Sequence, residues 1–165
     1  MILYSDDNFL TKDQCNALIN IYNQNIDKIF KHREQYPLDI DKLENLTDRV
    51  EKICRDLNPL SELDTHQIVM WPTNSYMIQH LDDSDDLFAA LIYLNDDYIG
   101  GETCFENITI KPKEGKLIIF CGAKQKHSVS KITEGTRYTF GMWFQSKTKY
   151  NIPDENIITN HSFVI

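Results

Sequence analysis

The spacing of apolar residues along the chain changes near residue 65. In the first part, apolar side chains recur at intervals of three, four and seven residues, which is the period of an amphipathic helix. From Cys15 onward they predict a helix over about residues 12–32. Thr11 and Gln14 have the spacing of a capping box, so the helix is expected to begin there.

A second run with the helical period predicts another amphipathic helix over about residues 39–57. Pro37 interrupts the pattern between the two helices. Asn58 and Pro59 end the second one, because proline disfavours helical geometry in the residue that precedes it. We expect both apolar faces to pack on the sheet of their own domain; a partner-binding helix is the alternative for the first.

Beyond residue 65 the chain has short apolar or alternating runs bounded by turn-forming residues, which is the pattern of β-strands. Strands are expected at residues 65–71, 76–80, 87–94, 103–105, 108–110, 116–121, 128–132 and 137–144. Turn signals about every 8 to 12 residues are typical of an all-β sandwich or barrel. With the leading helices, the expected fold is mainly β: a double-stranded β-helix, or jelly roll, supported by two helices.

The length of 165 residues fits a single domain. We expect residues 1–60 to hold the supporting helices, residues 65–146 to form the jelly-roll core, and residues 147–165 to form a polar C-terminal arm. The net charge is −8 and the pI is about 5.0. This acidic balance argues against a nucleic-acid partner, because nucleic-acid affinity rests on clustered Lys and Arg.

The four cysteines form no Cys-x-x-Cys pair and lie in apolar surroundings, as small buried hydrophobes do in a reducing compartment. No charged-then-apolar leader opens the chain, and no apolar run approaches the ~18 residues of a membrane span. We therefore expect a soluble, cytoplasmic protein without a membrane partner. The sequence leaves its oligomeric state open.

Candidate chemistry lies in four polar residues of the second part. His80 and Asp82 are two residues apart, so on an extended strand their side chains point to the same side. With His127 they make two imidazoles and one carboxylate, the facial triad that suits Fe(II) and leaves open positions. Arg137 is a permanent cation that would hold an anionic co-substrate against that metal.

These residues resemble the 2-oxoglutarate and Fe(II)-dependent oxygenases, and within them the prolyl 4-hydroxylase-like group. The resemblance covers about residues 66–146. It also rests on three runs, which are Gly100-Gly101-Glu102-Thr103, Pro112-x-x-Gly115, and Thr136-Arg137-Tyr138 with Trp143 downstream.

The resemblance implies a catalytic role for each matching residue. His80, Asp82 and His127 would bind Fe(II). Arg137 would bind the distal carboxylate of 2-oxoglutarate, and Tyr93 would be a second donor to the same group. The alternative for Tyr93 is a core aromatic whose hydroxyl bonds to the backbone.

Aromatic residues precede the ligand pair as well. Members of the family commonly have a tyrosine about ten residues before the first ligand; here Trp71 or Tyr76 lies in that neighbourhood, and Tyr76 is the candidate co-substrate contact. Together with Met77, these side chains are expected to line the mouth of the barrel. Trp143 is expected in the barrel core.

The resemblance implies an activity with defined co-substrates. It predicts an Fe(II)-dependent hydroxylase that uses 2-oxoglutarate and O₂, with ascorbate as a candidate reductant. The first expected substrate is a prolyl residue in a peptide or protein. The alternatives are a hydroxylase of a free amino acid or small metabolite, a metal-binding jelly roll without turnover, and a structural or interaction domain that keeps only the fold.

One further expectation concerns the register around Arg137. If residues 133–135 are the centre of a hairpin, Arg137 lies across from residue 131, which by parity shares a face with His127. A five-carbon diacid and an arginine side chain would then bridge the distance to the metal.

Overall fold

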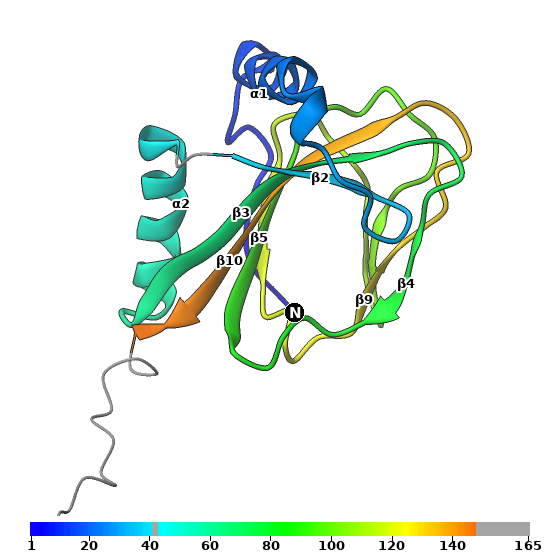
Figure 1. Ribbon diagram of the computed structural model, residues 1–165. Helices are drawn as coiled ribbons and strands as arrows, with labels where there is room; N and C mark the ends of the chain where they lie inside the picture. The colour runs from blue at the N-terminus through cyan, green and yellow to red at the C-terminus, as the bar shows by residue number, and fades with distance from the viewer. Residues whose placement is uncertain (41–42, 148–165) are drawn as a thin grey trace, which may run out of the picture.

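Two antiparallel β-sheets face each other, and two helices lie outside the larger sheet (Figure 1). The computed structural model describes residues 1–40 and 43–147. Within this range, the larger sheet has the strand order β1 (Ile2–Asp6), β8 (Leu117–Phe120), β5 (Asp86–Tyr93), β10 (Arg137–Ser146), β3 (Ser61–Trp71) and β2 (Tyr36–Asp39). The smaller sheet has the order β4 (Met77–His80), β9 (His127–Val129), β6 (Thr103–Phe105) and β7 (Thr109–Ile110). The predicted jelly roll with supporting helices is confirmed.

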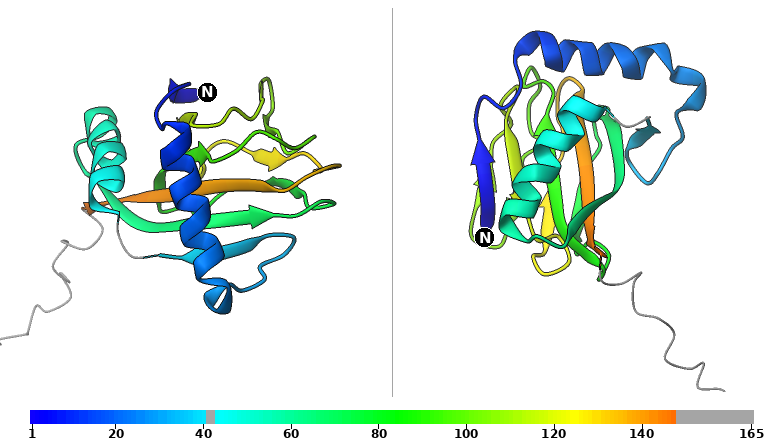
Figure 2. Two further views of the ribbon diagram at one scale, coloured as in Figure 1. Left: turned by 90° about the horizontal axis from the view of Figure 1, so that it is seen from above. Right: turned by 90° about the vertical axis from the view of Figure 1, so that its left-hand side faces the viewer.

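The helices cover only the outer face of the larger sheet (Figure 2). The two helices are α1 (Lys12–Gln24) and α2 (Glu44–Leu57). A short 3₁₀ turn, η1 (Ile26–Lys28), follows α1. The inner face of the sheet looks toward the smaller sheet instead. This arrangement leaves the space between the two sheets for a cavity.

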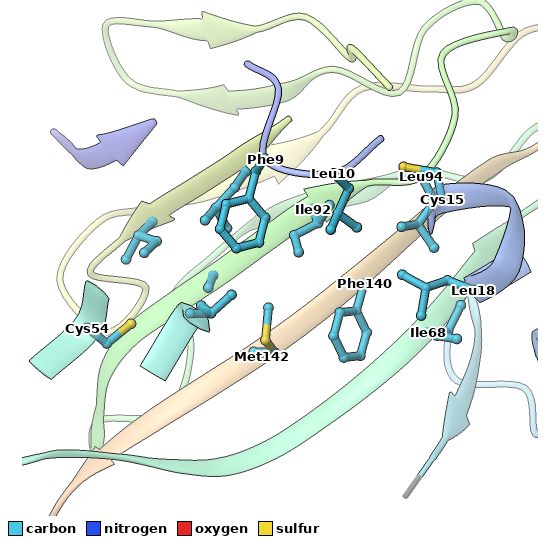
Figure 3. Close-up of a cluster of buried hydrophobic side chains, with 14 of the residues drawn as sticks. Phe9, Leu10, Cys15, Leu18, Cys54, Ile68, Ile92, Leu94, Phe140 and Met142 are labelled. Atoms are coloured by element: carbon cyan, nitrogen blue, oxygen red, sulfur yellow. The ribbon is translucent and has the colours of Figure 1, made fainter. Parts of the chain in front are cut away.

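Side chains alternate between the two faces of the larger sheet, and both faces are apolar. On β8, Leu117 and Ile119 belong to the core shared with the helices, whereas Ile118 and Phe120 belong to a cluster on the inner face. Because both faces are covered, the strand reads as a continuous apolar run in the sequence. Figure 3 shows the outer core, with Phe9, Leu10, Cys15, Leu18, Cys54, Ile68, Ile92, Leu94, Phe140 and Met142 labelled.

The capping box at the start of α1 is present as predicted. The Gln14 N–H donates to Thr11 Oγ1 at 3.3 Å, and the Thr11 N–H donates to Gln14 Oε1 at 2.9 Å. The predicted end of the helix near residue 32 is wrong. The helix stops before Asn25, whose side-chain amide donates to the Ile21 carbonyl at 2.8 Å and so satisfies a carbonyl of the last turn.

The second helix begins later than predicted, because the residues before it form β2. This strand pairs with β3 at the edge of the larger sheet, with Pro37 opposite Val69. An edge strand tolerates proline, since an N–H on its free side has no strand to bond to. The end of the helix is as predicted: α2 stops at Leu57, with Asn58 as its C-cap.

The predicted hairpin around residues 133–135 is wrong, because the chain changes sheets there. β9 pairs with β4 and β6, whereas β10 pairs with β3 and β5. Arg137 therefore lies opposite Trp71 of β3. The crossing segment bonds to two other loops: the Ile132 N–H donates to the Ser75 carbonyl at 2.9 Å, and the Ile99 N–H donates to the Glu134 carbonyl at 3.0 Å.

Other predictions concern the cysteines, the membrane and the arm. All four cysteines are free thiols, and Cys15 and Cys54 are buried. In the described part of the chain, no helix is long and apolar enough to span a membrane. The predicted arm lies outside the described residues from residue 148 onward.

We predict that Ile92→Ala lowers the free energy of unfolding by about 2–5 kcal/mol, because this fully buried side chain of β5 would leave a cavity in the outer core. Chemical denaturation measures the change. Ile78→Ala is the matched control: Ile78 is 68% exposed, so its loss should change stability by less than about 0.5 kcal/mol. Equal losses in both variants would contradict the core assigned here.

Candidate active site

The smaller sheet brings two histidines and an aspartate together. His80 ends β4 and lies opposite His127, which begins β9. Asp82 follows two residues after His80, and its Oδ1 lies 3.7 Å from His80 Nε2 and 3.5 Å from His127 Nε2. One ligand atom from each residue lies within 4.8 Å of the other two. This spacing is suited to a single metal ion that all three side chains bind at once.

Main-chain carbonyls fix the orientation of both imidazole rings. His80 Nδ1 lies 2.9 Å from the Ile78 carbonyl oxygen, and His127 Nδ1 lies 2.9 Å from the Gln125 carbonyl oxygen. A carbonyl only accepts hydrogen bonds, so each Nδ1 carries the proton. Each Nε2 therefore keeps its lone pair for a metal, and the two Nε2 atoms are those that face Asp82.

Burial and charge also suit a metal site. Burial lowers the pKa of His127, while its bond to the Gln125 carbonyl and the Asp82 carboxylate oppose that shift. A lowered pKa favours the neutral imidazole, which is the form that binds metals. Asp82 Oδ2 is buried without a hydrogen-bond partner among the described residues. A buried carboxylate oxygen without a donor is costly, and a cation would compensate it.

Gly122 leaves the space that the Asp82 carboxylate occupies, a role that the sequence alone does not indicate. A Cβ at Gly122 would lie 1.8 Å from Asp82 Oδ2 and 2.6 Å from its Cγ. The Gly122 carbonyl also accepts the Asp82 N–H at 3.1 Å. Backbone and side chain of the aspartate are thus both held against this glycine, and no larger residue fits there without moving the carboxylate.

Arg137 lies in the same cavity as the three candidate ligands and is 1% exposed. Its guanidinium lies 5.1 Å from the Trp71 ring centroid and 5.5 Å from that of Tyr93. In the described part of the chain, no carboxylate forms an ion pair with it. A buried cation without a counter-charge is unfavourable, so an anion bound beside Arg137 would stabilise it.

Thr103, not Tyr93, is the hydroxyl that faces the cavity. Tyr93 is fully buried, and its hydroxyl donates to Thr103 Oγ1 at 2.7 Å. Thr103 lines the cavity, and its Oγ1 lies 3.5 Å from Arg137 Nη2. Tyr93 thus contributes to the arginine site in two ways, through the Thr103 hydroxyl and through its ring beside the guanidinium. The Gly100-Gly101-Glu102-Thr103 run contains this threonine, but its residue type alone does not indicate a role in the site.

The predicted lining of the barrel mouth by residues before the ligand pair holds for two of three side chains. Trp71 and Met77 line the cavity, but Tyr76 is 48% exposed and does not. Tyr76 precedes β4 and does not line the outer groove next to the cavity either, so its contact with a co-substrate stays a prediction. Trp143 lines the cavity as well, and its ring lies over the Cα of Gly141, within 2.9 Å of where a Cβ would be.

A groove outside the triad continues the cavity to the surface. The two hollows share six residues: Gln35, Gln67, Met77, His80, Asp82 and Trp143. Arg33 lines the outer part, where its Nη1 lies 3.4 Å from Met77 Sδ. The metal triad is therefore reached from solvent past Met77 and Trp143.

The residues present thus fit a metal with histidine and carboxylate ligands and an anion beside it. The fit rests on the orphaned Asp82 oxygen, the two free Nε2 atoms and the uncompensated Arg137. Oxygen and imidazole donors without thiolate suit Fe(II).

Comparisons with known proteins give a family and several relatives. Residues 65–145 match the model of the 2OG-Fe(II) oxygenase superfamily. A putative prolyl 4-hydroxylase of Acanthamoeba polyphaga mimivirus is 27% identical over 124 residues, which are 59% of this chain and 51% of the relative. Human prolyl 3-hydroxylase 2 is 38% identical over 65 residues, 34% of this chain and 9% of that protein. The chain thus spans about half or less of the length of these curated relatives.

The solved structures show the same fold. The viral collagen prolyl hydroxylase of Paramecium bursaria Chlorella virus-1, in complex with 2-oxoglutarate, superimposes with a TM-score of 0.72 at 20% identity. The superposition covers 87% of this chain and 94% of that one. At this identity the similarity establishes the jelly-roll fold alone.

We predict that Asp82→Ala weakens Mn(II) or Fe(II) binding by more than about 100-fold, since loss of a group that only orients a ligand already weakens binding 10- to 100-fold. Gly122→Ala should also weaken it strongly, because the new methyl group displaces the Asp82 carboxylate. Anaerobic calorimetry measures both affinities, and circular dichroism checks the fold.

The control is His32→Ala, which removes an exposed histidine of the groove and should leave the affinity unchanged. Adding Gly122→Ala to the Asp82→Ala protein should cause no further loss, because the carboxylate that the methyl group would displace is gone. Wild-type affinity in Gly122→Ala would show that the glycine is not needed to place the ligand.

Proposed function

Because the chain belongs to the 2OG-Fe(II) oxygenase superfamily, we propose that it is an Fe(II)- and 2-oxoglutarate-dependent dioxygenase that hydroxylates a prolyl residue in a peptide or protein. One observation carries the proposal: a histidine–aspartate–histidine cluster and a buried arginine without a counter-charge line the same cavity. The metal cluster and the arginine are both needed to bind the co-substrate, since the metal would hold one end of 2-oxoglutarate and the arginine the other.

His80, Asp82 and His127 would hold the metal through two Nε2 atoms and a carboxylate oxygen. Three protein ligands leave open positions for a co-substrate and O₂. Bound Fe(II) would supply O₂ activation coupled to the oxidative decarboxylation of 2-oxoglutarate to succinate and CO₂. Ascorbate remains a predicted reductant for the iron.

Arg137 would bind and orient the far carboxylate of 2-oxoglutarate. Its planar guanidinium makes two parallel charge-assisted hydrogen bonds, which fix both the position and the direction of a carboxylate. The Thr103 hydroxyl, whose oxygen lies next to Arg137 Nη2 and accepts from Tyr93, would donate a further hydrogen bond at the same end. Because the arginine is buried, water does not screen this interaction.

The substrate would enter through the groove past Met77 and Trp143. Both are apolar surfaces next to the metal triad, and an indole face suits packing against a pyrrolidine ring. The similar proteins support a prolyl substrate, since the curated relatives are named as prolyl 4- and prolyl 3-hydroxylases. These names differ in the ring carbon that is hydroxylated. We therefore propose proline as the hydroxylated residue and leave the carbon open.

We predict that Arg137→Ala raises the KM for 2-oxoglutarate about 30-fold or more, because truncating one partner of a buried charge pair costs about 2–5 kcal/mol. Succinate formation at varied 2-oxoglutarate measures KM, and Mn(II) affinity should stay unchanged. Arg55→Ala is the control: Arg55 pairs with Glu51 on α2 and should not affect KM. A normal KM in Arg137→Ala would place the co-substrate elsewhere.

The substrate proposal is tested with matched peptides. A proline-containing peptide should stimulate succinate formation and gain one oxygen atom by mass spectrometry, whereas the same peptide with alanine for proline should do neither. Free L-proline and other amino acids form the second arm. If only free amino acids are hydroxylated, the substrate is a small metabolite; if metal and 2-oxoglutarate bind but no substrate yields succinate, the chain is a binding module.

A further inference from the structure

Two polar groups behind the cavity are buried and without a hydrogen-bond partner among the described residues: the Tyr98 hydroxyl and Arg137 Nε. Buried polar groups in proteins almost always have a partner. The two atoms are complementary, since the Nε–H donates and a phenol oxygen accepts. Tyr98 does not line the cavity, so its hydroxyl has no direct path to a ligand there.

Gly101 shows that the tyrosine ring and the arginine chain are neighbours. A Cβ built on this glycine would lie 2.9 Å from Tyr98 Cε2 and 3.1 Å from Arg137 Cδ. Both groups therefore flank the same point. The pKa of the Tyr98 phenol is consistent with this proximity: burial raises the pKa, and the neighbouring Arg137 cation opposes that rise.

The same loop also holds the backbone on both sides of Arg137. The Asn95 amide donates to the Thr136 carbonyl at 2.8 Å, and the Tyr138 N–H donates to Asn95 Oδ1 at 2.7 Å. The loop of residues 95–101, between β5 and β6, thus bonds at one end to the main chain of the residues on either side of Arg137 and lies at the other end beside the Arg137 side chain.

We propose that Tyr98 is a positioning residue that holds the Arg137 guanidinium through Nε and thereby sets the length of the 2-oxo diacid that the cavity accepts. An Nε–H that donates to the phenol oxygen leaves the two terminal nitrogens free for the carboxylate. The guanidinium then cannot swing along the cavity axis, so its distance from the metal triad is constant. A guanidinium held in this way would favour a diacid of one chain length, and the proposed function makes 2-oxoglutarate that diacid.

This inference rests on the proposed function, and equilibrium binding tests it without turnover. Calorimetry with Mn(II)-loaded protein measures the Kd for 2-oxoglutarate and for 2-oxoadipate, which is one carbon longer. Tyr98→Phe should weaken 2-oxoglutarate binding on the order of tenfold, the effect of one hydrogen bond to a charged group. It should weaken 2-oxoadipate binding less, so the preference for the shorter acid falls at least threefold, while Mn(II) affinity stays unchanged.

Two comparisons separate positioning from a purely structural role. In the Arg137→Lys background, which lacks the planar fork and its Nε–H, Tyr98→Phe should have no further effect on either Kd. Tyr138→Phe is the matched control, because Tyr138 neighbours Arg137 in sequence but packs on Tyr22 of α1, with ring centroids 5.5 Å apart. It should leave both Kd values unchanged.

The outcomes distinguish this inference from the proposal beneath it. A wild-type protein that binds Mn(II) but no 2-oxoglutarate would overturn the proposed function and this inference together. Normal 2-oxoglutarate binding in Tyr98→Phe, an unchanged preference between the two acids, or an equal loss in the Arg137→Lys background would overturn only the positioning role. A lower melting temperature with unchanged Kd values would show that Tyr98 serves stability alone.

Discussion

The pairing of β4 with β9 is the contact on which the candidate site depends. It sets His80 opposite His127, and Asp82 follows where β4 ends, so three ligand atoms from two distant segments come within 4.8 Å. Main-chain carbonyls then fix each ring with its Nε2 inward. Gly122 leaves room for the carboxylate. The precision of the site thus comes mainly from backbone groups, which cannot change rotamer.

The larger sheet forms the wall of the cavity opposite the metal triad. Its two faces have different roles, which explains how this wall can contain the charged Arg137. The helices cover the outer face, where the buried apolar side chains of β3, β5, β8 and β10 form the stabilising core. The inner face is thereby free to hold Arg137, whose burial without a counter-charge is unfavourable in the protein alone. The loop of residues 95–101 holds that arginine from behind.

The prediction of elements succeeded at two places where the local chemistry is strong, and two of its failures arise where a partner strand decides. The capping box of α1 and the end of α2 follow from chemistry within a few residues. The late start of α2 does not follow from local chemistry, because the strand before it, β2, exists only by pairing with β3 at a sheet edge. The hairpin at residues 133–135 failed for the same reason: the turn residues indicate a reversal but do not say which sheet receives the next strand.

The sequence by itself determined the fold class, from the change in hydrophobic period, and the candidate residues His80, Asp82, His127 and Arg137, from their order and chemistry. Only the tertiary structure decided which neighbours complete the site. Thr103 faces the cavity in place of Tyr93, Tyr76 lies outside it, and Gly122 and Tyr98 enter as spatial neighbours. Residue type and spacing specify what a side chain can bind, but packing between distant segments decides what it meets.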